Sequence, residues 1–193
     1  MALQTRTVTP TKVLTGTGIM YVGLYGTATE PSAGDVNTTP QLTAGWTEVG
    51  ATKDGLTTNI TQEFYQSKVD AIPDPLNSHL VSREVRVTTN MAEATLANLA
   101  IALNDSTATT GSGYSKLSLP TGGSGYSPTY RSLIVDGYGP GTNKKRRFLA
   151  RRVLSVEPIE SSQKDDDDAV WSVTFLAHYV DASTPPCDWI DET

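Results

Sequence analysis

Residues 56–64, Leu-Thr-Thr-Asn-Ile-Thr-Gln-Glu-Phe, alternate in polarity along the chain. Leu56, Ile60 and Phe64 fall on the even-numbered positions, and the odd-numbered positions are all polar. Because successive side chains of a strand point to opposite faces, this stretch predicts a β-strand with one apolar and one polar face. We expect such a strand to be half-buried in an antiparallel sheet.

A second alternating stretch follows at residues 80–89. One of its faces is apolar apart from a single arginine, and the other is polar throughout. The apolar face carries Val81, Arg83, Val85 and Val87, and the polar face carries Ser82, Glu84, Arg86 and Thr88. Two such stretches close together predict a pair of neighbouring strands.

Residues 65–78 separate the two predicted strands and contain Pro73 and Pro75 on either side of Asp74. Proline cannot donate a hydrogen bond to a strand ladder, so it is excluded from central strands. The sequence therefore predicts a protruding loop here.

The period changes after residue 90. Residues 91–103 are rich in Ala and Leu at helical spacing, and Asn90 with Glu93 three residues later is typical of a capping box. This pattern predicts one helix.

The rest of the chain predicts further strands and loops. Strands are expected at residues 17–26, 46–49, 130–138, 147–158 and 169–181, which favours a mainly β, antiparallel sandwich or barrel with one flanking helix. We expect one β domain over 17–181, preceded by an N-terminal arm (1–16), interrupted by a mobile Gly/Ser-rich insertion (104–128) and followed by a polar tail (182–193).

Charge is distributed unevenly. The net charge of the 193 residues is −6, yet six of the 15 basic residues fall within nine positions: Lys144, Lys145, Arg146, Arg147, Arg151 and Arg152. Without this basic strip, 9 basic residues stand against 21 acidic ones, a net charge of −12. An acidic body with one basic strip suits association between identical copies better than DNA binding, because the overall charge repels phosphate.

The sequence contains few residues suited to catalysis. Its two histidines, His79 and His178, belong to no recognisable catalytic or metal motif, and Cys187 is the only cysteine. We therefore expect no enzymatic activity, no cofactor and no metal. The amino terminus lacks the apolar core of a signal peptide, and no apolar run approaches the ~20 residues of a membrane span, so we expect synthesis in a cytoplasm.

The order of motifs over residues 46–103 resembles the major tail tube proteins of siphophages. The resemblance depends on Trp46-Thr47-Glu48-Val49-Gly50, on Lys53-Asp54-Gly55-Leu56-Thr57 opening a strand, on the Asp- and Pro-containing loop, and on the Ala/Leu helix. It implies a β-sandwich subunit that closes into rings of six and stacks into the tube of a non-contractile tail.

The resemblance also implies partners and a location. Further copies of the chain, a tape-measure protein, a tail terminator and distal tail or baseplate proteins would be its partners, and double-stranded DNA would pass through without sequence-specific binding. The protein would assemble in the host bacterial cytoplasm and reside in the virion tail.

Two groups of residues are candidates for functional surfaces. Candidates for the channel lining are the polar-face residues Thr57, Asn59, Thr61, Glu63, Ser82, Glu84 and Arg86, which could alternatively face outside solvent. Candidates for contacts between subunits are Asp70, Asp74, Lys144, Lys145, Arg146, Arg147, Arg151 and Arg152. On this interpretation, reversing the four arginines of the strip to glutamate blocks ring stacking and leaves the subunit folded.

Other functions fit the same composition. A β-sandwich binding or decoration module of a virion accounts for the strands and loops, although not for the order of motifs. An inner-tube subunit of a contractile tail or tailocin is closer in class. A nucleic-acid-binding protein ranks third and predicts steeply salt-dependent DNA affinity.

Overall fold

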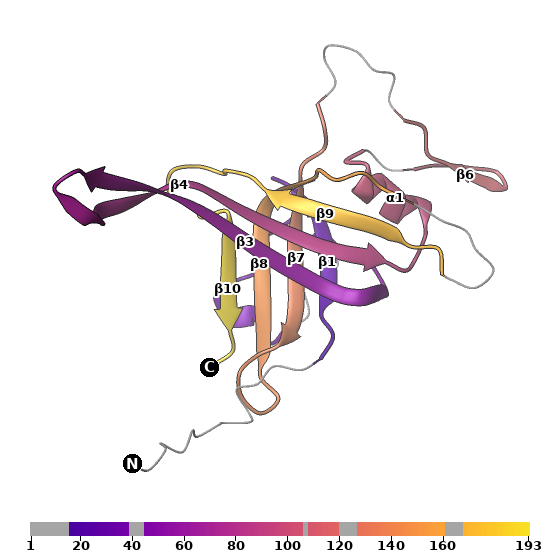
Figure 1. Ribbon diagram of the computed structural model, residues 1–193. Helices are drawn as coiled ribbons and strands as arrows, with labels where there is room; N and C mark the ends of the chain where they lie inside the picture. The colour runs from indigo at the N-terminus through magenta and orange to yellow at the C-terminus, as the bar shows by residue number, and fades with distance from the viewer. Residues whose placement is uncertain (1–15, 39–44, 106–107, 120–126, 161–167) are drawn as a thin grey trace.

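The computed structural model describes residues 16–38, 45–105, 108–119, 127–160 and 168–193 (Figure 1). The elements in chain order are β1 (Ile19–Leu24), the 3-10 turn η2 (Ala33–Asp35), β2 (Trp46–Glu48), β3 (Thr52–Val69), β4 (Ile72–Met91), α1 (Leu96–Ala102), β5 (Thr109–Gly111), β6 (Tyr114–Lys116), β7 (Arg131–Tyr138), β8 (Lys145–Ser155), β9 (Trp171–Ala177) and β10 (Cys187–Asp191). All strand pairs are antiparallel. The prediction of a mainly β, antiparallel protein with one flanking helix is confirmed.

Strand β8 joins two layers of strands. Its first half pairs with β7 on one side and β10 on the other, and its last three residues pair with β9. A register shift in β8 separates the two halves, opposite residues 131–133 of β7. Strands that bend in this way pass from one sheet of a sandwich to the other. One layer therefore holds β2, β1, β7, β8 and β10, and the other holds β3, β4, β9 and the end of β8 (Figure 1).

The main core lies between these layers. Its members come from both sheets and from the helix, and they include Met20, Leu133, Val87, Phe175 and Ile101. Phe175 and Leu133 are fully buried. The outer side of the first layer has a smaller apolar cluster around Trp46, whose indole Nε1 donates to the carbonyl of Thr29 at 2.8 Å.

The predicted loop at 65–78 is wrong, because β3 and β4 continue into it as one long hairpin. The turn lies between Val69 and Ile72. The rule on proline still applies locally. Pro73 and Pro75 lie in the part of β4 that faces the register shift between Ser67 and Val69 of β3, where regular pairing is interrupted. The hairpin does protrude, as expected, and extends well past β9 (Figure 1).

The helix begins later than predicted. Strand β4 runs to Met91, and Thr95 is the N-cap, with its side chain accepting a hydrogen bond from the Asn98 backbone N–H at 3.2 Å. Glu93 does cap a backbone N–H, but the donor is Ala51 at 3.1 Å rather than Asn90. The strand prevailed because β4 pairs with β9 up to Met91.

Two further segments contain strands that the sequence did not predict. Residues 187–191 of the predicted polar tail form β10, which pairs with β8. Within the described part of the Gly/Ser-rich insertion, β5 and β6 form a short hairpin, and the mobility of the insertion stays a prediction. The predicted N-terminal arm lies outside the described residues except for Gly16.

Candidate functional site

The seven candidate lining residues lie together on one face of the β3–β4 hairpin. We call it the outer face because it points away from the main core of the subunit, to which Val85 and Val87 on the other face belong. Three cross-strand pairs contain six of them: Asn59 with Arg86, Thr61 with Glu84, and Glu63 with Ser82; the seventh, Thr57, faces Thr88. Ser82 Oγ donates to Glu63 Oε2 at 3.1 Å. The period-two pattern therefore grouped these side chains correctly, although whether they line a channel stays a prediction.

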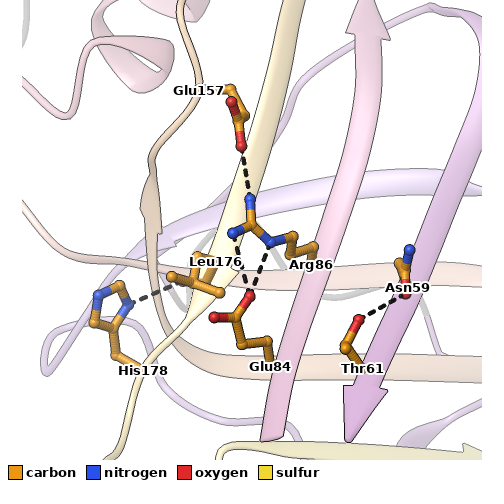
Figure 2. A network of polar contacts seen from close by, with 7 residues as sticks. All are labelled: Asn59, Thr61, Glu84, Arg86, Glu157, Leu176 and His178. Carbon is orange, nitrogen blue, oxygen red and sulfur yellow. Dashed lines mark hydrogen bonds and ion pairs between the residues drawn. The ribbon is translucent and has the colours of Figure 1, made fainter. Parts of the chain in front are cut away.

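Arg86 is the centre of this polar face (Figure 2). Its Nη1 donates to Glu157 Oε1 at 2.6 Å, and its Nε and Nη2 both lie 3.2 Å from Glu84 Oε2. Hydrogen bonds to Glu84 and Glu157 raise the pKa of Arg86. Glu157 could not be predicted from the local pattern, because it lies 71 residues from Arg86 and just beyond β8.

The polar face continues onto the neighbouring strand β9. Thr88 and Thr174 share a hydrogen bond of 3.1 Å between their hydroxyl groups. Counting charges, Glu63, Glu84 and Glu157 against Arg86 give three negative and one positive, a net −2 on this face. The face is therefore hydrophilic across three strands and acidic on balance.

The opposite, inner face of the same hairpin carries exposed apolar side chains. Ile60, Phe64 and Leu80 are 49, 52 and 44% exposed. The distal part of the hairpin extends beyond β7 and β8 (Figure 1). The expectation of a half-buried strand is thus wrong for the distal half of β3. Exposed apolar side chains gathered in this way are typical of an interaction surface.

The hairpin also has unpaired strand edges. Within the described residues, β3 pairs only with β4, so its other edge is free along all 18 residues. Strand β4 pairs with β9 only from Arg86 to Met91, which leaves its distal half free on that side. Free edges are templates for pairing with another chain.

Four of the six residues of the basic strip pair with acids of the same subunit. Arg147 is 1% exposed and forms a two-pronged ion pair with Asp136 at 2.7 and 2.8 Å. The other contacts are Arg146 with Asp191, Arg151 with Glu30 and Asp188, Lys144 with Glu192, Lys145 Nζ with the Asn37 carbonyl, and Arg152 with the Tyr179 carbonyl and the ring of Tyr130. The expectation that four arginines can be reversed with the fold retained is wrong for the buried Arg147.

The other candidates for contacts between subunits, Asp70 and Asp74, lie at the far end of the hairpin. Both are exposed, and neither forms an ion pair or hydrogen bond with a described residue. The structure therefore does not bring them to the basic strip of the same subunit. A role between subunits stays a prediction for both groups.

Strand β10 is held by ion pairs that acid should weaken. Arg146 donates to both Asp191 oxygens, at 2.5 and 2.7 Å, and these hydrogen bonds lower the pKa of Asp191 below its ordinary value of 3.8. Because the folded pKa is lowered, the pair stabilises the fold above pH 3.8 and loses that effect as the pH falls through the folded pKa. The pair is partly exposed, so its contribution is expected to be only about 0–1 kcal/mol.

The Arg146→Ala variant is therefore expected to return the pKa of Asp191 to near 3.8, as measured by NMR titration of the carboxyl carbon. Asp181 is the control, since hydrogen bonds from Ser183 and Thr184 lower its pKa to about 2. Its titration should be the same in both proteins. An unchanged Asp191 titration would show that Arg146 does not hold it.

The single cysteine reports on the docking of β10. Cys187 packs against the main core, and burial raises the pKa of its thiol to about 11. Only the thiolate reacts with iodoacetamide, so at pH 8 the folded protein should be alkylated on the order of 100-fold more slowly than the protein in urea. Equal rates in both conditions would mean that β10 is not docked in solution.

Among the described residues, no helix is both long and apolar enough to cross a membrane. No three His, Cys, Asp or Glu side chains in that part of the chain are placed to hold a metal ion. No protein-family model matches the chain, and a search of curated proteins finds none with significant similarity to it.

Proposed function

We propose that this chain is a structural subunit that assembles with itself into the tube of a long, non-contractile bacteriophage tail. The observation that carries the proposal is the β3–β4 hairpin. It extends past β9 with free edges on both strands, a polar outer face and an exposed apolar inner face. A subunit with such a hairpin is incomplete alone, and neighbouring copies can complete it.

Closure into a ring would pair the free strand edges of the hairpin with those of neighbouring copies. The free edge of β3 and the free distal edge of β4 lie on opposite sides of one hairpin, so lateral association places different edges of two copies side by side. A contact between two different surfaces generates a closed ring when the rotation between copies closes. Joining sheets into a barrel removes the exposed edges altogether.

The polar face suits the lining of a DNA channel. Thr57, Asn59 and Thr61 present hydroxyl and amide groups, and the acidic residues around Arg86 leave the face with a net −2 per subunit. A negative wall repels phosphate, so DNA can slide without binding. The tape-measure protein would occupy the channel before the genome passes.

Electron microscopy and light scattering on one purified sample test this proposal. Hollow tubes are expected, or rings near 124 kDa, which is six times 20.6 kDa. Subunits that wait for a tape-measure template would remain monomeric alone and polymerise when the cognate initiator complex is added. Protein that stays monomeric in both conditions would contradict the tube and favour a virion binding module.

A further inference from the structure

An apolar groove lies at the root of the β3–β4 hairpin, beneath its inner face. Two adjoining hollows, of about 260 and 170 Å³, share Arg83, Val85 and Pro186 in their walls. The C-terminal segment that leads into β10 forms the opposite wall. We call this site the Arg83 groove and define it by Ile60, Leu80, Arg83, Tyr179, Pro186 and Trp189.

The groove has the composition of a protein-binding site. Tyr179 and Trp189 are 69 and 46% exposed, although both are large aromatic residues. Arg83 is exposed between them, and its guanidinium forms no ion pair or hydrogen bond with any described residue. Trp, Tyr and Arg are the residues that most often anchor protein interfaces. A guanidinium flanked by apolar side chains favours a partner with a carboxylate between apolar groups.

The tip of the same hairpin has this chemistry. Val69, Ile72 and Leu76 are 43, 44 and 53% exposed. Asp70 and Asp74 alternate with them and have no partner among the described residues. The tip therefore carries two carboxylates among exposed apolar side chains, against one lysine, Lys68. Its net charge of −1 is opposite to that of Arg83, and its apolar side chains match the apolar walls of the groove.

A tip cannot occupy the groove of its own subunit. Arg83 lies twelve positions after Ala71, which is at the turn, and at strand spacing these twelve steps span roughly 40 Å. The hairpin leads away from the body along this length (Figure 1). The two complementary surfaces are thus widely separated along one continuous hairpin, so a contact between them joins two copies.

We propose that the hairpin tip of one copy docks in the Arg83 groove of a second copy. Asp70 and Asp74 face Arg83, and Val69, Ile72 and Leu76 cover the apolar walls. The contact joins two different surfaces, so each copy retains a free tip or a free groove and the assembly can continue. The inference rests on the proposed self-assembly but does not require that the product be a tube.

Substitutions that reverse the charge of each surface test this contact. Arg83→Glu and the double variant Asp70→Lys/Asp74→Lys are each expected to weaken self-association on the order of 30-fold or more, measured by sedimentation velocity at low salt. Mixing the two variants, or combining all three substitutions in one chain, should restore association. Lys116→Glu in β6 is the control, because it makes the same charge change as Arg83→Glu far from the groove.

The outcomes separate this contact from the tube. An Arg83→Glu protein that associates like the wild type, or a triple variant no better than the single-surface variants, overturns the docking. Rescue accompanied by assemblies that are not hollow supports the docking and contradicts the tube. Normal tubes from Arg83→Glu contradict the docking and leave the tube intact. A wild type that shows no association, alone or with its initiator, overturns both.

Discussion

The Arg147→Met variant is expected to lose about 3–5 kcal/mol of unfolding free energy, the largest effect of any change in the basic strip. Arg147 is 1% exposed, and its guanidinium holds Asp136 together with the carbonyls of Asp35 and Thr38, at 3.2 and 2.7 Å. Methionine fills similar space but leaves the Asp136 carboxylate, which is 14% exposed, without its partner. Urea denaturation followed by circular dichroism measures the loss.

The neighbouring residue provides a matched control. Arg146 also forms a two-pronged pair, with Asp191, but both side chains are more than one-third exposed. Arg146→Met should therefore cost only about 0–1 kcal/mol. Adding Asp136→Leu to Arg147→Met should recover much of the stability, because an apolar pair can replace a buried ion pair. Equal losses from Arg146→Met and Arg147→Met would contradict this account.

The Phe64→Asp variant is expected to abolish assembly and leave the subunit folded. Phe64 is 52% exposed on the inner face of the hairpin, so aspartate there buries no charge in the free subunit. In an assembly that covers this face, the charge would be desolvated. A loss of at least 2 kcal/mol, about 30-fold in association, is typical of a central interface position.

Thr61→Asp is the matched control for Phe64→Asp. It introduces the same charge three residues away in β3, but on the polar outer face opposite Glu84. Assembly should continue, because the tube interpretation leaves this face in contact with water. Light scattering and electron microscopy report assembly, and circular dichroism reports folding. If Thr61→Asp blocks assembly and Phe64→Asp does not, the two faces have been assigned the wrong way round.

The local patterns of the sequence predicted the hairpin well. Alternation alone placed Asn59, Thr61 and Glu63 on one face, and the structure pairs them with the polar residues of β4. It also placed Arg83 among valines, and a charged residue on an apolar face was the available sign of the groove. The pattern could not show that the inner face is uncovered, because coverage depends on where β7 and β8 end in space.

Contacts between distant residues account for most of the errors. The acidic residues of 182–193 look like a solvated tail, yet Asp188 and Asp191 pair with arginines 37 and 45 positions earlier. The same pairs supply two arginines of the basic strip with acids from within the subunit. Proline chemistry excluded regular pairing around Asp74 but could not exclude a hairpin with a local break.

The passage of β8 between the layers has a mechanical consequence. Lys145 to Ala150 is bonded to β7 and β10, and Val153 to Ser155 is bonded to β9. A pull on the hairpin is transmitted through β4 and β9 into the same backbone that anchors the other sheet. Because β8 belongs to both sheets, sliding of one sheet past the other would have to deform β8, so we expect a bend or torque imposed on the hairpin to twist this strand.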